Sequence, residues 1–158
     1  MAISVSDYLI DQDGIDWPKA LASWSWLVPP EFTLWLVNRF ADLFVVVPDG
    51  AVHMLDVGAG TLTKVAESRD HFCEKIDVGG SADEWLMIPL VDRMVAAGIT
   101  LRHGECYGFK TLPVLGGDYA VENAAPLPVW DYLGACGSIH EQLRDLPDGS
   151  QVVIEVVE

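Results

Sequence analysis

Short apolar runs separated by turn residues mark the middle of the chain. Residues 43–47 (LFVVV), 52–57 (VHMLDV) and 61–65 (TLTKV) are rich in strand formers, and residues 48–50 (PDG) and 58–60 (GAG) carry turn chemistry. Strands joined by such short turns pair antiparallel, because a parallel pair needs a long crossover connection. The pattern therefore predicts an antiparallel meander of three strands.

Two helical stretches are predicted after this meander. Residues 68–76 (SRDHFCEKI) begin with Ser68, whose hydroxyl suits an N-cap. Residues 81–98 (SADEWLMIPLVDRMVAAG) are also helical, with Pro89 breaking, kinking or restarting the helix and Gly98 ending it. The second half of this stretch carries an apolar stripe made of Leu90, Val91, Met94 and Val95.

The best-marked helix lies near the C-terminus, after residues 121–133 (VENAAPLPVWDYL), which are predicted to be partly extended. Its apolar residues recur at the spacing of one helical face, and they are Tyr132, Cys136, Ile139 and Leu143. Residues 147–149 (PDG) then turn the chain into a predicted terminal strand over residues 151–157 (QVVIEVV).

The N-terminal region predicts a short helix over residues 5–10, with Ser4 as its cap. Residues 31–40, which follow two prolines, predict a further helix, although their apolar residues fit a strand nearly as well. Together the elements predict a single α+β domain with a mostly antiparallel sheet flanked by several helices. Residues 1–28 form a short helical N-terminal segment in this interpretation, and residues 29–158 form the α+β domain.

The composition indicates a folded chain with a strongly negative net charge. Hydrophobic residues make up 51% of the 158 residues, and the longest apolar run is too short to span a membrane, so a soluble cytoplasmic protein is expected. Twenty-four acidic residues against nine basic ones give a formal charge of −15. Such a field repels nucleic acid and anionic membranes and accelerates encounter with a basic protein, although solubility alone also accounts for it.

Cysteine and histidine spacing gives no metal or cofactor site. Cys73, Cys106 and Cys136 are widely spaced and odd in number, which favours reduced, partly buried thiols. The pairs His71–Cys73 and His103–Cys106 match no standard zinc spacing. We therefore expect neither a metal nor a cofactor.

The motifs that suggest chemistry each lack a required residue. DVGAGT at residues 56–61 has Thr63 where a dinucleotide fingerprint needs its third glycine, and GFKT has Phe109 where a phosphate loop needs glycine before its lysine. Cys136 and His140 are four apart on one predicted helix, but Cys136 belongs to the apolar stripe. We expect no catalytic residues, and a small hydrolase using this pair is the weakest alternative.

Residues 107–119 (YGFKTLPVLGGDY) combine glycines, a proline, aromatics and charges. This composition suits two tight turns that present groups to another protein, while the aromatics could equally belong to the core. The candidate partner-binding residues are Glu105, Tyr107, Lys110, Asp118, Tyr119 and Glu122.

From about residue 29 onward the chain resembles a known family. RFADLFVVVPDGAVHMLDVGAGTL, ADEWLMIPLVDRMVAAG, CYGFKTLPVLGGDYAVEN and GSIHEQLRDLPDG are similar to the Tdi-type immunity proteins, which accompany DNase toxins of type VI secretion in bacteria. The family combines a GAD-related part with a C-terminal domain, and it looks related to the SUKH-type immunity superfamily. The chain departs from its pattern at Ala124-Ala125, where an aromatic is expected, and in the helix from Trp130.

The resemblance implies a non-enzymatic antitoxin and supplies no catalytic residues. Residues 29–158 would be the immunity-type domain, and the partner would be a cognate basic toxin, a DNase, with no direct binding to nucleic acid or membrane. An acidic inhibitor would be steered towards the basic cleft of a DNase. The alternative within the same resemblance is a SUKH-like regulatory or scaffold module that binds another protein.

Overall fold

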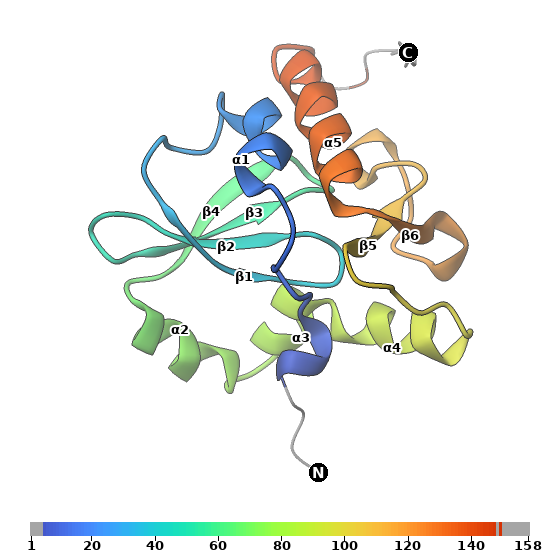
Figure 1. Cartoon of the computed structure of the whole chain (residues 1–158), viewed down its shortest axis with the longest axis horizontal. Helices are drawn as coiled ribbons and strands as arrows, with labels where there is room; N and C mark the ends of the chain where they lie inside the picture. The colour runs from blue at the N-terminus through green and yellow to red at the C-terminus, as the bar shows by residue number, and fades with distance from the viewer. Residues whose placement is uncertain (1–4, 148, 150–158) are drawn as a thin grey trace.

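The computed structural model describes residues 5–147 and residue 149 (Figure 1). The predicted terminal strand over residues 151–157 and the predicted Ser4 cap lie outside the described residues. The first element is a short 3-10 helix, Val5–Tyr8, at the start of the predicted N-terminal helix.

The predicted meander is confirmed. Strands β2 (Leu43–Val46), β3 (Val52–Asp56) and β4 (Thr61–Ala66) follow one another antiparallel, and β1 (Thr33–Val37) extends the sheet to the order β1-β2-β3-β4. Figure 1 shows this sheet as a central layer between groups of helices. With a smaller second sheet, the described chain is one α+β domain, as the pattern predicted.

The helix predicted over residues 31–40 is wrong, because that segment forms β1. Thr33 pairs with Val46 and Val37 pairs with Leu43, with a bulge near Trp35. Branched and aromatic side chains fit a pleated, half-buried surface, and an open edge of β2 lies next to the segment. Pairing with this buried strand outweighs the helix-start signal of the two prolines.

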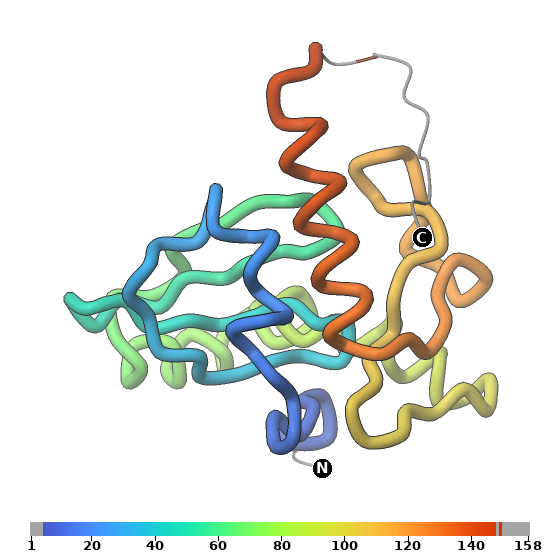
Figure 2. Tube along the Cα trace, turned by 45° about the horizontal axis from the view of Figure 1, so that its top comes forward, coloured from blue at the N-terminus to red at the C-terminus, as the bar shows by residue number. Residues whose placement is uncertain are grey.

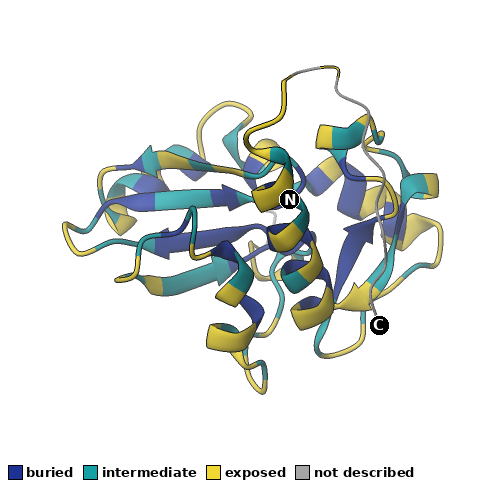
Figure 3. Ribbon diagram, turned by 90° about the horizontal axis from the view of Figure 1, so that it is seen from above, coloured by how far each residue is buried: buried dark blue, intermediate teal, exposed yellow. Residues whose placement is uncertain are grey.

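Strand β2 is covered on both faces, which explains its continuous apolar run. Leu43 and Val45 belong to a core that includes α5, whereas Phe44 packs with Phe72 and Trp85 in a second core. Successive side chains of a strand point to opposite faces, so both cores need apolar residues. In Figure 3 buried residues are frequent in the strands, whereas the turns and the outer faces of the helices are exposed.

Helices α2 (Arg69–Ile76) and α3 (Ser81–Leu86) cover the Phe44 face, as Figure 1 shows. The Ser68 N-cap is confirmed, since its hydroxyl accepts the His71 N–H at 3.0 Å. Met87 takes a left-handed conformation, with φ of 53°, and separates α3 from α4 (Ile88–Ala96), so the predicted break near Pro89 is confirmed.

The apolar stripe predicted on α4 is correct in three of its four positions. Leu90, Val91 and Met94 are buried, but Val95 is 52% exposed. Val95 lies one residue beyond Met94, about 100° further around the helix, and α4 has no neighbour on that side in the described structure.

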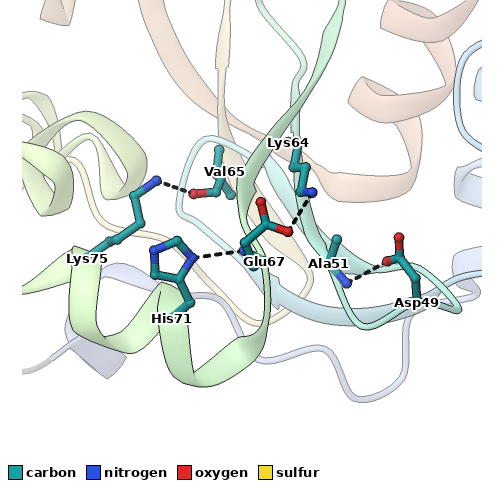
Figure 4. A network of polar contacts seen from close by, with 7 residues as sticks. All are labelled: Asp49, Ala51, Lys64, Val65, Glu67, His71 and Lys75. Atoms are coloured by element: carbon teal, nitrogen blue, oxygen red, sulfur yellow. Dashed lines mark hydrogen bonds and ion pairs between the residues drawn. The ribbon is translucent and has the colours of Figure 1, made fainter.

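A polar junction fixes α2 to the end of β4 (Figure 4). The Lys64 ammonium donates to Glu67 at 2.8 Å, and the Glu67 N–H donates to His71 Nδ1 at 2.9 Å. Lys75 reaches back from α2 to the Val65 carbonyl at 2.7 Å. The contacts made by His71 and Lys75 therefore link α2 to the end of β4.

The other face of the sheet is covered by α1 (Trp17–Ala20) and α5 (Val129–Leu143). Figure 2 shows the N-terminal residues running beside α5. The Trp24 indole N–H donates to the Leu133 carbonyl at 2.9 Å, and Gly137 permits this approach because a Cβ there would overlap Ser23. Trp24 is fully buried, so this part of the N-terminal region contributes to the main core.

A second sheet completes the fold beside α5. Strand β5 (Glu105–Phe109) pairs antiparallel with β6 (Ala124–Pro128), which leads directly into α5. The Tyr107 N–H donates to the Arg39 carbonyl at 2.8 Å and joins this sheet to the loop after β1. None of the helices in the described part of the chain is long and apolar enough to cross a membrane.

His140 joins α5 to the turn between β3 and β4. Its Nε2 lies 2.7 Å from the Val57 carbonyl oxygen, and its ring lies over Gly60, which has φ of 73°. The His140 side chain is buried, because the turn folds over it.

Gly60 provides a test of this contact. A Cβ on Gly60 would overlap the His140 ring, whereas a Cβ on Gly79, which has φ of 61°, meets nothing within 4 Å. We expect Gly79→Ala to lower the free energy of unfolding by about 1–2 kcal/mol through backbone strain alone. Gly60→Ala should cost roughly 1–3 kcal/mol more through overpacking, measured by urea denaturation. Equal losses in the two variants would contradict the contact.

A buried polar cluster centred on Asn38 and Asp42 lies at the β1–β2 turn. The Asn38 amide donates to Asp42 Oδ2 at 3.0 Å and to the Trp85 carbonyl at 2.8 Å. Asp42 Oδ1 accepts the Val57 N–H at 2.9 Å. Burial and the nearby Asp56 carboxylate raise the pKa of Asp42 to about 7, although its two hydrogen bonds favour the charged form.

Asp42 should therefore make stability fall with rising pH. The folded state retains a proton that the unfolded chain releases near pH 3.8, so this contribution is complete below that pH and is lost as the pH rises through about 7. We expect the free energy of unfolding of the wild type, minus that of Asp42→Asn, to fall by roughly 2–4 kcal/mol between about pH 4 and 8. Urea denaturation across that range measures it.

His140 titrates in the opposite direction and cancels in this comparison. Burial lowers the pKa of His140, so its contribution is fully present above the unfolded value of about 6.5 and is lost as the pH falls from there through the lower folded pKa. Both proteins carry His140, and the difference between them isolates Asp42. A difference that stays constant or rises with pH would show that Asp42 is ionised throughout.

Candidate protein-binding surface

A closed loop between β5 and β6 carries four of the six predicted partner-binding residues. It covers residues 110–123, and we call it the β5–β6 loop. Lys110, Asp118, Tyr119 and Glu122 lie on it, and all four are exposed. The local sequence explains its course, because Pro113 starts a 3-10 helix, Pro113–Leu115, and Gly116 ends it with φ of 92°.

Asn123 holds the β5–β6 loop closed. The side-chain NH2 group of Asn123 donates to the backbone carbonyls of Thr111 and Asp118, both at 2.9 Å. The side-chain oxygen of Asn123 accepts the Thr111 N–H at 2.9 Å. Gly117 is needed beside this clamp, because a Cβ there would overlap the Thr111 carbonyl. The predicted turn chemistry therefore produces one ordered loop.

The β5–β6 loop also rests on the turn between β3 and β4. The Val114 N–H donates to the Gly58 carbonyl at 3.3 Å, and a Cβ on Gly58 would come within 3.1 Å of Pro113. The Tyr119 ring meets Phe109 edge-on, with centroids 5.3 Å apart, and remains 50% exposed. An aromatic that is half anchored and half exposed suits contact with another protein.

The other two predicted residues lie elsewhere. Tyr107 is 1% exposed, and its hydroxyl donates to the Ile99 carbonyl at 2.6 Å, so this side chain belongs to the core and is left out of the surface we propose. Glu105 lies at the opposite end of β5 from the loop, where its carboxylate accepts the Arg102 N–H at 2.8 Å. Residues 107–109, which were included in the stretch expected to form two tight turns, instead belong to β5, and this strand buries Tyr107.

A cleft beside Glu105 was missed by the sequence pattern. It lies between residues 14–19, 103–105 and 128–130 and has a volume of about 540 Å3. Trp130, at its wall, is 56% exposed. The signal was available, because Trp130 lies two residues before Tyr132 and so turns away from the apolar stripe of α5.

The residues considered for catalysis do not form a nucleophile site. Burial raises the pKa of the Cys136 thiol to about 12, so this cysteine is a neutral thiol at physiological pH. Cys106 is also buried, whereas Cys73 is exposed, and all three are free. The described residues contain no group of three or more His, Cys, Asp or Glu side chains placed to hold a metal ion.

Comparisons with known proteins found a family model that matches part of the chain and a solved structure of similar fold. Residues 66–140, just under half of the chain, match the model for "T6SS immunity protein Tdi1, C-terminal", which supports a role as a type VI secretion immunity protein. A crystal structure of Atu4351 from Agrobacterium tumefaciens has a similar fold, with a TM-score of 0.52 and 18% sequence identity over 77% of this chain and 60% of that one. No curated protein matches this chain.

Removing the Asn123 clamp should loosen the β5–β6 loop alone. We expect Asn123→Ala to speed amide hydrogen exchange at residues 110–123 by roughly 5–100-fold, because three hydrogen bonds with a net value of about 1 kcal/mol each are lost. Exchange in β2 and β3 should change far less. Glu122→Ala, which leaves the clamp intact, is the control, and equal acceleration in both variants would contradict the assignment.

Proposed function

We propose that this chain is a non-enzymatic immunity protein that neutralises a type VI secretion DNase toxin by stoichiometric binding. The observation that carries the proposal is the match of residues 66–140 to the Tdi1 C-terminal model. This segment contains the whole β5–β6 loop and the strands that hold it. The unreactive Cys136 thiol is consistent with a binding role.

Charge supports a basic partner. The chain has a formal charge of −15, and a DNase carries cationic groups where it contacts the DNA backbone. Opposite fields raise the rate of encounter, and buried aromatic contacts then slow dissociation. An immunity protein benefits from rapid capture, because free toxin cleaves the chromosome until it is bound.

The β5–β6 loop is the contact surface in this proposal. It offers the half-exposed Tyr119 ring as an anchor, with Lys110, Asp118 and Glu122 around it. Its backbone is already held by Asn123 and by the β3–β4 turn, so little conformational entropy is lost when a partner binds. Rigid loops of this kind bind more tightly than flexible ones of equal area.

Co-expression tests the proposal. A toxin gene found next to the gene for this chain is expressed in bacterial host cells with and without the chain, and DNA integrity and co-purification are scored. We expect DNA degradation only when the chain is absent, and a stable complex when it is present. A chain that neither protects the DNA nor co-purifies with the toxin would refute immunity, and this outcome favours a regulatory module for another protein.

The acidic residues of the β5–β6 loop should govern association. We expect Asp118→Lys with Glu122→Lys to slow association with a catalytically inactive toxin roughly tenfold at low ionic strength and to flatten its salt dependence. Glu74→Lys with Asp77→Lys makes the same change in net charge at the end of α2 and serves as the control. Stopped-flow kinetics that show equal effects in both double variants would place the contact elsewhere.

A further inference from the structure

Trp130 differs from the other five tryptophans of the chain. Each of those five has a partner: the indoles of Trp17, Trp24 and Trp26 donate to backbone carbonyls, and the rings of Trp35 and Trp85 pack on Phe72. Trp130 is 56% exposed, and within the described residues its indole has neither a hydrogen bond nor a ring contact. A large apolar surface of this kind is a frequent anchor of protein interfaces.

The surroundings of Trp130 form a cleft with ordered carboxylates. We call it the Trp130 cleft, with the bounds given above and a volume within the range of binding clefts. Glu105 Oε1 accepts the Arg102 N–H at 2.8 Å, and Asp16 Oδ1 accepts the Lys19 N–H at 3.2 Å. Both carboxylates are therefore held by backbone groups while they line the cleft.

The charge around the cleft favours a cation. His103, which lines the cleft, contacts two aspartates. Its Nδ1 is 3.7 Å from Asp11 Oδ2, and its Nε2 is 2.8 Å from the backbone carbonyl oxygen of Asp13. Among the residues that line the cleft, Asp16 and Glu105 are acidic and Lys19 is the one lysine or arginine. An apolar groove between α1 and β1, lined by Leu21, Phe32 and others, has no comparable charge to identify its occupant.

We propose that the Trp130 cleft binds an arginine side chain of the toxin, as a second contact beyond the β5–β6 loop. The guanidinium would stack on the exposed indole and donate to Glu105 and Asp16. Arginine fits better than lysine because its planar group stacks on aromatic rings and donates to carboxylates at the same time. This inference rests on the proposed function for the identity of the partner.

The two contacts would lie at opposite ends of β5. Glu105 begins this five-residue strand and Lys110 follows its last residue, so the strand spaces them by roughly 13–17 Å. This distance lies well within a standard protein interface. A toxin that reaches both ends would be gripped along the second sheet, and changes at the cleft and at the loop should act independently.

Binding of an inactive toxin to the full-length chain tests the cleft. The probe is the catalytically inactive product of the adjacent toxin gene, and binding is measured by biolayer interferometry at two salt concentrations. We expect Trp130→Ala to weaken binding about 10–100-fold, mainly through faster dissociation, and Trp130→Phe to restore part of it. Val95→Ala removes another exposed apolar side chain, on α4, and should leave binding unchanged.

Glu105→Gln separates an arginine from an apolar occupant. The amide oxygen can still accept the Arg102 N–H, so only the charge is lost, and we expect binding to weaken about 3–10-fold with less dependence on salt. If Trp130→Ala weakens binding and Glu105→Gln does not, an apolar group occupies the cleft and the arginine assignment is overturned.

The outcomes also separate this inference from the proposed function. If the wild-type chain does not bind the toxin, the immunity proposal is rejected. If the wild-type chain and Trp130→Ala bind the toxin equally well, only the proposal for the Trp130 cleft is rejected. Circular dichroism of the variants checks that each is folded. If Trp130→Ala does not fold, Glu105→Gln still tests the cleft.

Discussion

A chain of buried hydrogen bonds links the two helical layers through the sheet, and the rest of the structure depends on it. It runs from the Trp85 carbonyl on α3 to Asn38, from Asn38 to Asp42, and from Asp42 to the Val57 N–H. The Val57 carbonyl then meets His140 on α5. Buried polar groups are costly unless each is paired, so this path admits one arrangement of the helices about the sheet.

The same path positions the proposed contact surface. Val57 and Gly58 belong to the β3–β4 turn, which Asp42 and His140 hold from two sides, and Gly58 accepts the Val114 N–H of the β5–β6 loop. The loop is therefore supported from below by the core network and closed on itself by Asn123. The proposed contact surface is therefore ordered before any partner binds, which is what the proposed rapid capture of a toxin requires.

The sequence was sufficient where local signals agreed with packing. The meander over β2 to β4, the Ser68 cap and α5 follow from turn residues and from apolar periodicity, and the structure contains them all. The prediction for the β1 segment was wrong because its sequence suits a helix and a strand alike. Only pairing with the open edge of β2 selects the strand. Such a choice depends on contacts between residues far apart in sequence.

The candidate site was predicted in part for the same reason. Glycine, proline and charged residues predicted turns with exposed groups over residues 107–119, and the structure has turns from residue 110 onward, with Lys110, Asp118 and Tyr119 exposed. Composition could not tell that Tyr107 would be drawn into the core by β5 pairing, or that the 103–105 and 14–19 segments, about 90 residues apart, would meet as a cleft. Local composition identifies exposed residues, whereas a cleft exists only after the chain has folded.

The placement of the basic residues explains how the acidic field persists around these surfaces. Lys64 pairs with Glu67, Lys75 binds the Val65 carbonyl, and Arg69, Lys75 and Arg144 lie over tryptophan rings. Four of the nine lysines and arginines thus make local contacts, and the twenty-four acidic side chains leave the chain with a formal charge of −15. Because acidic residues outnumber basic ones, the chain has a net negative potential, and this is the field that the proposal uses to steer a cationic toxin towards the β5–β6 loop and the Trp130 cleft.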